Sequence, residues 1–213
     1  MKKELKNQNG GGRDALKSAL WGMLLLCVLL LIDMVTKIAA DAYFSQAGAP
    51  DSISLIPGYL EFRISYNTGI AFSIGAGAPE WAKIALVAGT GVMFVGLTVV
   101  YFMLDKRRRW LRATLVFIVA GGIGNFIDRT LYLIDPTMLA GVRDMVRLKI
   151  WFMDFGVCNF ADFFIVGGAV ALMLSLVFFD AWAIYPLTDK YKALVKEYEE
   201  KEEAKKREKA GNK

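Results

Sequence analysis

The chain has 213 residues, of which 55% are hydrophobic, and its mean hydropathy is positive at +0.39. A soluble domain of this length would contain shorter apolar runs, so the composition excludes an ordinary soluble enzyme and indicates a membrane protein. The formal net charge is +5, and because the basic residues stand beside apolar spans, we interpret the surplus as a topology signal and expect no nucleic-acid binding.

Four apolar spans occupy most of the chain. They cover residues 19–40, 81–104, 111–127 and 163–185. A helix needs about 20 apolar residues to cross the hydrocarbon core of a bilayer. The alternative of a cleaved secretory signal is disfavoured for the first span, because the apolar core of a signal has only about 7–15 residues. We therefore predict an all-α membrane protein with four transmembrane helices.

Polar segments flank these spans. Residues 1–18 contain a Gly-rich run and are predicted to be a disordered cytoplasmic segment. Residues 188–213 place Glu and Lys four positions apart, as at Glu197 and Lys201, which predicts a charged, cytoplasmic helical tail. Residues 19–187 between them form the predicted four-helix membrane domain.

The connection between the first two spans is predicted to contain a small β-rich extracytoplasmic element. Residues 52–56 and 59–66 alternate between apolar and polar side chains, and Pro57-Gly58 between them is a turn signal. The connection at residues 129–158 is also long, but it mixes apolar and basic residues without a clear period. We interpret it as a loop.

Basic residues predict the orientation of the spans. They concentrate before the first span, in the loop at 105–112 and in the C-terminal tail, whereas the loop at 41–80 contains only Arg63. Both termini are therefore expected in the cytoplasm. The loops at 41–80 and 129–158 are expected on the outer side.

The available side chains restrict the chemistry. The chain has no histidine and two cysteines, Cys27 inside the first span and Cys158 beyond the third. These two thiols lie at different depths, and ordinary zinc sites need more His and Cys ligands than the chain offers. We predict no metal, no other cofactor, and a chemistry carried by carboxylates.

Ionisable and amide side chains gather at span ends on one side of the membrane. A charge at mid-depth costs about 2.5–3.5 kcal/mol on insertion scales, so such residues indicate a site. They are Asp33 and Lys37 at the end of the first span, Asn125, Asp128 and Arg129 at the end of the third, and Asn159 and Asp162 at the start of the fourth. Asn67 and Gly69 add a polar turn in the first outer loop.

Each of these patterns alone also has a structural explanation. Asp33 and Lys37 are one helical turn apart and would form an ion pair. The glycines at 121–124 let helices approach closely, and Asp162 is well placed to cap a helix. Together, however, Asp162 and a second carboxylate from Asp144 or Asp154 would supply an acid and a base, because two carboxylates in one site do not both ionise easily.

Four segments together resemble the lipoprotein signal peptidase family, also called signal peptidase II. They are Asp33-Met-Val-Thr-Lys37, Asn67-Thr-Gly-Ile-Ala-Phe-Ser73, Gly121-Gly-Ile-Gly-Asn-Phe-Ile-Asp-Arg129 and Cys158-Asn-Phe-Ala-Asp162. The resemblance implies a four-span aspartic endopeptidase of the bacterial inner membrane, with its active site at the extracytoplasmic face. Its substrates would be lipid-modified prolipoproteins, cut just before a diacylglyceryl-cysteine, with membrane lipid around them and no metal. We expect a monomer.

The resemblance also implies the catalytic pair, Asp144 and Asp162. The family places its first Asp in a Val-x-Asp-Phe-like segment a little under twenty residues before the second. Asp144 lies 18 residues before Asp162, whereas Asp154 lies 8 residues before it, although Phe155 gives Asp154 the more similar context. Spacing favours Asp144. Asp128 is a third candidate, interpreted as a partner of Arg129.

The remaining residues are assigned supporting roles by the same resemblance. Those expected to orient the pair or bind the peptide backbone are Asn125, Asp128, Arg129 and Asn159, and those expected to shape the entrance are Asp33, Lys37, Asn67 and Gly69. A small proton-coupled membrane transporter is the alternative, although such proteins relay protons through acids at mid-depth. A membrane scaffold would leave the clustered Asn and Asp unexplained, and a Ser/Lys peptidase would need a serine partner beside Lys37 or Lys83.

Overall fold

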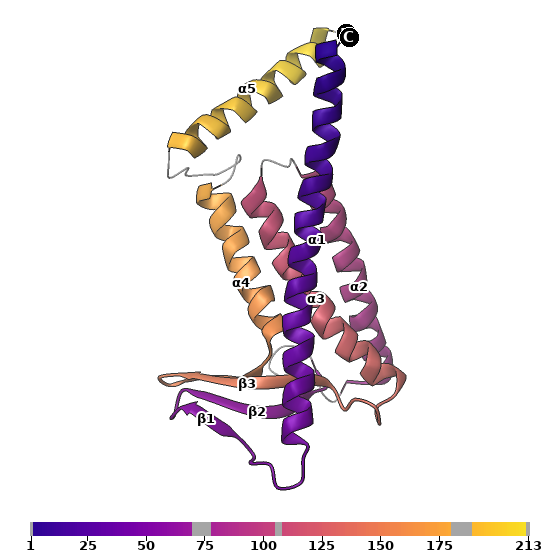
Figure 1. Ribbon diagram of the computed structural model, residues 1–213, viewed down its shortest axis with the longest axis vertical. Coiled ribbons are helices and arrows are strands. Elements are labelled where there is room, and N and C mark those ends of the chain that lie inside the picture. Colours follow the sequence, from indigo (N-terminus) through magenta and orange to yellow (C-terminus); the bar gives the residue numbers. More distant parts are fainter. Residues whose placement is uncertain (1, 70–77, 105–107, 180–188, 212–213) are drawn as a thin grey trace.

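The computed structural model describes residues 2–69, 78–104, 108–179 and 189–211 (Figure 1). In chain order the elements are α1 (Lys2–Phe44), β1 (Ile53–Ile56), β2 (Leu60–Asn67), α2 (Glu80–Met103), α3 (Arg109–Ile134), β3 (Val142–Ile150), β4 (Met153–Cys158), α4 (Phe160–Leu174), the π-helical turn η2 (Ser175–Phe179) and α5 (Asp189–Gly211).

Four helices are long and apolar enough to cross a membrane, which confirms the predicted spans. They are Leu16–Phe44, Glu80–Met103, Arg109–Ile134 and Phe160–Phe179. In α3, 61% of the most apolar window is buried inside the protein, against 11% in each of the other three, so α3 is the central helix. It packs against α1, α2 and α4. The predicted third span ended too early, because the polar residues that follow it are buried in protein rather than exposed to lipid.

A further difference concerns the N-terminal end of the chain. α1 begins at Lys2, so the N-terminal segment that we predicted to be disordered is helical and continues the first span. Once a helix is nucleated, each added residue gains a hydrogen bond at little further cost. The helical tail is confirmed by α5, in which Lys201 donates to Glu197. Residues 180–188, which include the predicted end of the fourth span, lie outside the described residues.

A four-stranded antiparallel sheet, in the order β1-β2-β3-β4, lies across one end of the helix bundle (Figure 1). β1 and β2 confirm the predicted hairpin. β3 and β4 show that our interpretation of residues 129–158 as a loop was wrong. The first five residues of β3, Val142 to Val146, are all buried, because this half of the strand is covered on both faces. A strand of this kind lacks the alternation that identifies a half-buried strand.

Glycines let α3 approach its neighbours closely, as their spacing predicted. A Cβ atom at Gly121 would overlap the carbonyl oxygen of Ala161 on α4, and one at Gly124 would overlap the carboxylate of Asp33 on α1. Deeper in the bundle, Leu29, Leu115 and Val116 form part of an apolar core. These contacts hold α1 and α4 against the face of α3 that carries the polar residues.

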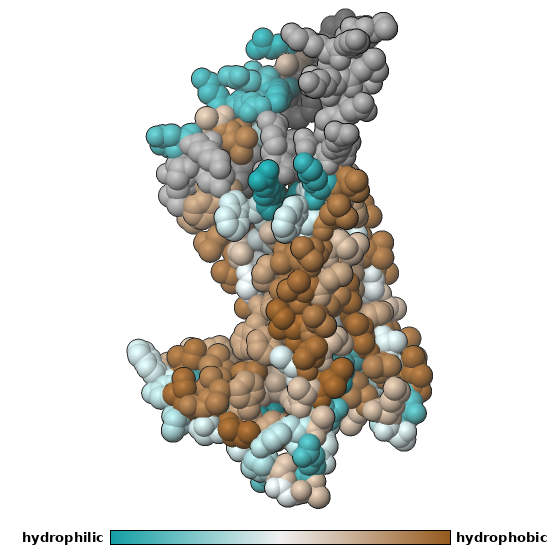
Figure 2. All heavy atoms as spheres, viewed as in Figure 1, coloured by the Kyte–Doolittle hydropathy of each residue, from teal (hydrophilic) through white to brown (hydrophobic). Residues whose placement is uncertain are grey.

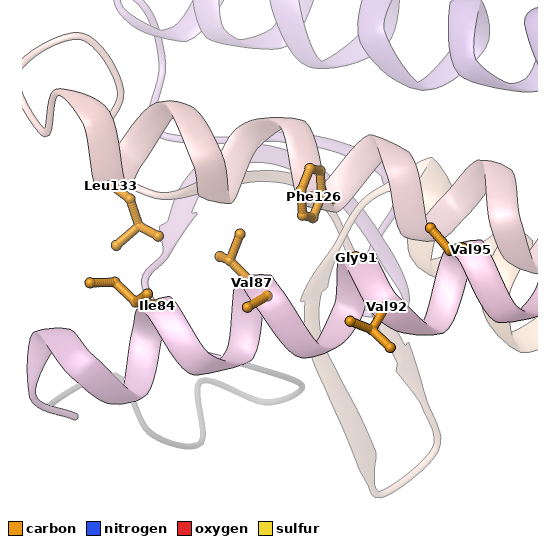
Figure 3. A pocket seen from close by; sticks show the side chains of 8 residues that line it. Ile84, Val87, Gly91, Val92, Val95, Phe126 and Leu133 are labelled. Carbon is orange, nitrogen blue, oxygen red and sulfur yellow. The ribbon is translucent and has the colours of Figure 1, made fainter.

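The outward faces of the helices are apolar, as a bilayer requires. Figure 2 shows an apolar belt of hydrophobic residues across the visible face of the bundle. A groove of about 460 Å³ between α2 and α3 opens onto this belt (Figure 3). Its lining is entirely apolar and comprises Ile84, Val87, Ala88, Gly91, Val92, Val95, Phe126 and Leu133.

The close approach at Gly121 gives a stability prediction. Gly121→Ala should lower the free energy of unfolding by about 1–3 kcal/mol, the usual cost of forcing extra atoms into a packed interior. The midpoint of thermal unfolding in detergent measures this effect. Gly167→Ala on α4 is the matched control, because a Cβ there would meet nothing within 4 Å. Equal midpoints for the two variants would contradict the close packing of α3 on α4.

Candidate active site

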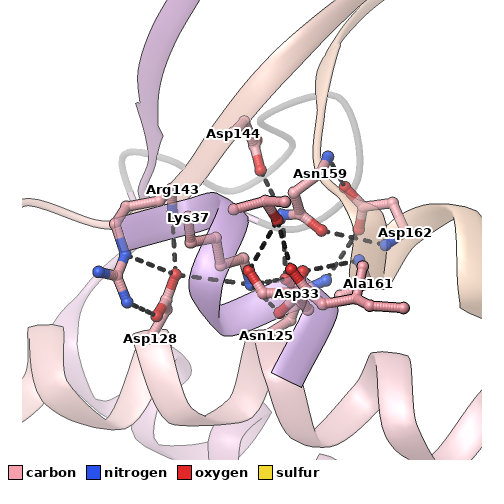
Figure 4. Close-up of polar contacts among 11 residues, drawn as sticks. Asp33, Lys37, Asn125, Asp128, Arg143, Asp144, Asn159, Ala161 and Asp162 are labelled. Atoms are coloured by element: carbon pink, nitrogen blue, oxygen red, sulfur yellow. Dashed lines mark hydrogen bonds and ion pairs between the residues drawn. The ribbon is translucent and has the colours of Figure 1, made fainter. Parts of the chain in front are cut away.

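A buried polar cluster lies where α1, α3 and α4 meet the sheet (Figure 4). α1 supplies Asp33 and Lys37, and the side chains of both are fully buried. α3 supplies Asn125 and Asp128, which face the same way because they are one helical turn apart. The remaining groups come from β2, β3 and the first turn of α4.

Lys37 is the centre of the cluster. Its ammonium donates to Asn125 Oδ1 at 3.0 Å and forms ion pairs with Asp33 Oδ2 at 2.8 Å and Asp128 Oδ2 at 3.6 Å. The other carboxylate oxygen of Asp33 accepts a hydrogen bond from the backbone N–H of Ala161 at 2.8 Å. The ion pair of Lys37 and Asp33 on α1 thereby contacts α3 through Asn125 and Asp128, and it contacts α4 through Ala161.

Asp128 pairs with Arg143 and not with its neighbour Arg129, so the predicted partnership was wrong. Arg143 Nη2 lies 2.6 Å from Asp128 Oδ1, and the Arg143 Nε and backbone N–H both donate to Asp128 Oδ2. Adjacent residues on a helix point in different directions, so Asp128 and Arg129 do not face each other. Arg129 Nη2 instead donates to the carbonyl oxygen of Gly69 at 3.2 Å.

Arg143 is a site residue that sequence reasoning missed. Its position beside Asp144 was the only available signal, and a single basic residue in a presumed loop is uninformative. The β3 register shows its role, since Arg143 pairs across the sheet with Tyr66 and Asp144 pairs with Ser65. Successive strand residues point to opposite faces, so the two side chains leave β3 on different sides.

Asp144 and Asp162 are linked through two asparagines. Asn159 Nδ2 donates to Asp144 Oδ1 at 2.6 Å, and Asn125 Nδ2 donates to Asp162 Oδ1 at 2.8 Å. The asparagines also contact each other, with Asn159 Nδ2 lying 3.0 Å from Asn125 Oδ1. Asn67 on β2 adds a further side-chain hydrogen bond to Asp144. The two carboxylates therefore belong to one hydrogen-bonded network.

The direction of Asp162 is fixed by the start of α4. Asn159 is the N-cap residue, and its side chain accepts the Asp162 backbone N–H at 3.0 Å. Asp162 Oδ2 in turn accepts the backbone N–H of Asn159 at 3.0 Å, which completes a reciprocal capping box. We predicted that Asp162 caps this helix, but the N-cap residue is Asn159 and Asp162 is its partner three positions later. The capping box also orients the Asp162 carboxylate.

Asp144 is held in an environment that favours its protonated form. Burial, the largest cause, and the nearby negative charge of Asp162 together raise its pKa to about 7, although hydrogen bonds from Asn159 and Asn67 act in the opposite direction. An aspartate in water loses its proton near pH 4. Asp144 therefore titrates close to neutral pH, as one member of a carboxyl pair is expected to do.

Asp154 lies apart from this network. Its side chain is 43% exposed on β4 and pairs with Arg147 at 2.7 Å and with Lys149 at 3.9 Å. The hydrogen bond from Arg147 lowers the pKa of Asp154, so this carboxylate is ionised at neutral pH. Between the two candidates, the structure brings Asp144 into the cluster with Asp162 and leaves Asp154 in a surface ion pair.

The turn after β2 completes the cluster. Asn67 Oδ1 accepts the backbone N–H of Gly69 at 2.9 Å, and the carbonyl of the buried Gly69 accepts Arg129. Residues 70–73 of the predicted motif lie outside the described residues. All ten residues singled out from the sequence thus belong to one site, to which the structure adds Arg143.

The thiol of Cys158 is adjacent to the site and chemically quiet. Its Sγ donates to the carbonyl of Val146 at 3.2 Å, and burial raises its pKa to about 12. A thiol of this kind is protonated at neutral pH and is a poor nucleophile. Among the described residues, no group of three or more His, Cys, Asp and Glu side chains is arranged to hold a metal ion.

Comparison with known proteins gives a consistent result. The family model described as signal peptidase (SPase) II matches residues 25–178. A lipoprotein signal peptidase from Microcystis aeruginosa is 33% identical over 156 residues, which are 73% of this chain and 90% of that protein. One from Ectopseudomonas mendocina is 34% identical over 72% of this chain and 86% of that protein.

The fold is similar to that of a solved structure as well. A bacterial membrane enzyme determined by the in meso method at 2.3 Å resolution superposes with a TM-score of 0.60. The two chains are 26% identical, and the match covers 73% of this chain and 87% of the other. Residues 25–178, which match the family model, contain most of each of the four spans and every residue of the polar cluster, and the chain belongs to the signal peptidase II family.

Proposed function

We propose that this protein is an aspartic endopeptidase that removes signal peptides from diacylglyceryl-modified prolipoproteins, cutting just before the lipidated cysteine. Membership in the signal peptidase II family and the relatives described as lipoprotein signal peptidases support the substrate class. The observation that carries the catalytic type is the pair Asp144 and Asp162, bridged by Asn125 and Asn159.

In the proposed reaction the two carboxyl groups take different roles. Asp144 has a pKa of about 7, so it carries a proton in much of the population at neutral pH. It hydrogen-bonds the scissile carbonyl and later protonates the leaving amine. Ionised Asp162 removes a proton from the attacking water. The asparagine donors hold one oxygen of each carboxyl group, which leaves the pair oriented before substrate arrives.

The surrounding charges support this arrangement. Asp33 and Asp128 balance the charges of Lys37 and Arg143 within the buried cluster. Arg129 interacts electrostatically with both Asp162 and Asp144. Its guanidinium would stabilise the negative charge that develops on the carbonyl oxygen during attack.

We further propose a bacterial inner-membrane location with both termini in the cytoplasm and the site at the extracytoplasmic face. The basic residues at the N-terminal end of α1, at 105–112 and in the tail support this orientation. The acyl chains of the substrate would stay in the bilayer while the peptide enters the site, and the protein would act as a monomer. A proton-coupled transporter is not favoured, because the acids of the cluster gather where the spans meet the sheet (Figure 4).

Substitution of the three aspartates tests the catalytic assignment. Asp144→Asn and Asp162→Asn should each lower the cleavage rate by at least about 10³, the scale seen when a catalytic group is removed. Asp154→Asn should change it by less than about tenfold, because its partner is a surface Arg147. The measurement is the mass shift of a diacylglyceryl-modified prolipoprotein incubated with purified protein in detergent.

The unfolding midpoint of each variant in the same detergent is the control for folding. An inactive Asp154→Asn protein together with an active Asp144→Asn protein would mean that the pair is wrongly assigned. Activity in the Asp162→Asn protein would exclude the two-carboxyl mechanism altogether.

The raised pKa of Asp144 predicts the pH dependence of the reaction. The proton on Asp144 is present below about pH 7 and is lost as the pH rises through that value. The cleavage rate should therefore fall on the alkaline side, approaching tenfold per pH unit, with an apparent pKa near 7 that belongs to the coupled pair. Initial rates between pH 5 and 9 measure this limb, and a rate that is flat from pH 6 to 9 would contradict it.

The stability of the folded protein should also decrease as the pH rises, and this can be measured without an activity assay. The pKa of Asp144 is raised from 3.8 in the unfolded chain to about 7 in the folded protein. Its contribution to stability is therefore complete below about pH 4 and is lost as the pH rises through 7. The unfolding midpoint should decrease between pH 5 and 8, and Asp144→Asn should make this decrease smaller because the amide does not titrate.

The orientation has its own test. A reporter fused after Lys213 should score as cytoplasmic, and a cysteine at the exposed position of Gly48 should react with an impermeant reagent from outside the cell. A matched cysteine at Lys17, at the N-terminal end of the first span, should not react until the membrane is opened. Labelling of Lys17→Cys but not Gly48→Cys in intact cells would reverse the proposed orientation.

A further inference from the structure

The end of the β3–β4 hairpin projects from the body of the protein. The first five residues of β3 are buried, and exposure then increases over the last four, which end at Ile150. At about 3.4 Å per residue, these four carry the tip about 14 Å beyond the buried half. We call residues 147–156 the arm. Figure 1 shows that it extends sideways past α4, across the direction of the spans.

The tip of the arm consists of four consecutive apolar residues. Trp151 and Phe152 are 83% and 89% exposed, and Ile150 and Met153 on either side are exposed as well. Figure 2 shows hydrophobic atoms gathered on this part of the molecule, next to the apolar belt of the helices. A concentration of exposed apolar side chains is usual at a surface that contacts a membrane or another protein.

The backbone at the tip is unfavourable for a large side chain. Trp151 has φ +53°, the only positive φ of a non-glycine residue in the described part of the chain. Glycine adopts this conformation freely, whereas a bulky residue does so at a cost in free energy. An outlier of this kind supports a functional explanation for the side chain. Glycine would adopt the backbone conformation of this turn at lower cost. The presence of a large indole here therefore favours a role for the side chain.

The charges of the arm are paired with one another and with Glu61 on β2. Arg147 contacts Asp154 at 2.7 Å and Glu61 at 3.7 Å, and Lys149 lies 3.9 Å from Asp154. The base of the arm therefore holds two basic and two acidic groups in contact. A partner recognised through this surface is attracted by apolar and aromatic groups, not by a net charge.

We propose that the tip of the arm, residues 150–153, inserts into the interface of the bilayer beside α4. Three observations support lipid as the occupant. The arm runs across the spans at the level where the bundle meets the sheet, its apolar tip is continuous with the apolar belt, and its charges are already neutralised. Trp is enriched at the boundary between hydrocarbon and headgroups, where its ring is buried and its N–H stays hydrated.

Insertion at this position would fix the depth of the sheet. Asp144 lies on the same strand as the tip, in the half of β3 that is buried against the bundle. With the tip held in the interface, one end of β3 is anchored in the protein and the other end is anchored in the membrane. This inference concerns how the sheet sits on the bilayer and stands independently of the proposed peptidase activity.

Site-directed spin labelling tests the proposal. A nitroxide at Phe152→Cys, in a background lacking Cys27 and Cys158, is measured in phosphatidylcholine vesicles with oxygen and with a water-soluble nickel chelate. Oxygen should relax the label more than nickel does. The matched control is Ala47→Cys, exposed in the polar turn after α1, where nickel should dominate. Equal unfolding midpoints show that both labelled proteins are folded.

Each outcome of this measurement is informative. Preferential access of oxygen to position 152 supports insertion into the bilayer. The same nickel access at 152 as at 47 would overturn the proposal in favour of a solvent-exposed tip. Protection from both reagents would overturn it in favour of a protein partner or a second copy of this chain.

A second measurement does not depend on the labelled variant. Brominated lipids quench tryptophan that lies within the bilayer, and the difference between the parent protein and Trp151→Phe isolates the signal of this one indole among the five in the chain. Quenching of the difference signal by lipid brominated near the headgroup is expected. Quenching by aqueous iodide instead would contradict insertion.

Discussion

The structure depends on a buried ammonium group. Lys37 is completely buried at the end of a membrane-spanning helix, and an unpaired charge there would cost more than the packing around it could offset. Its neighbours are arranged to prevent this. Asp33, Asp128 and Asn125 surround it, and Arg143 balances the second acid. Because these groups come from α1, α3 and β3, neutralising one charge also assembles the helix bundle and the sheet.

Asn125 connects this structural cluster to the candidate catalytic pair. Its carbonyl oxygen accepts Lys37 and Asn159, and its amide donates to Asp162. An amide at this position accepts on one side and donates on the other, so its orientation is fixed by the ammonium group and cannot flip without losing contacts on both sides. The direction of Asp162 is thus set from two sources, the capping box of α4 and the buried ion pairs. Pre-organisation of this kind is what a carboxyl pair requires of its surroundings.

The sequence was sufficient to predict features that depend on a local pattern or on the free-energy cost of placing polar groups near a membrane. Apolar length predicted the four spans, and the Pro57-Gly58 turn predicted β1 and β2. The cost of polar groups near a membrane identified seven of the ten residues that lie together, and a polar turn and the spacing to Asp162 added Asn67, Gly69 and Asp144. It was insufficient where a feature depends on tertiary contacts. β3 has no alternation because both of its faces are covered, and the pairing of Asp128 with Arg143 depends on a strand that pattern alone did not reveal. The helical N-terminus was missed because the composition of residues 1–18 favours disorder. The helix of the first span acts as a nucleus from which helical structure extends into this segment, and local composition does not reveal that effect.

The central position of α3 has a consequence for how the protein is made. α3 is the least apolar of the four spans and the most buried in protein, and its buried polar groups find partners on α1, β3 and α4. During synthesis α3 leaves the ribosome before β3 and α4 exist, so Asp128 and Asn125 then lack most of their final contacts. Only Lys37 on α1 is already available to them. The contacts of Lys37 with Asp128 and Asn125 therefore join the two helices of the site that are made first, and the contacts with β3 and α4 can only be added later.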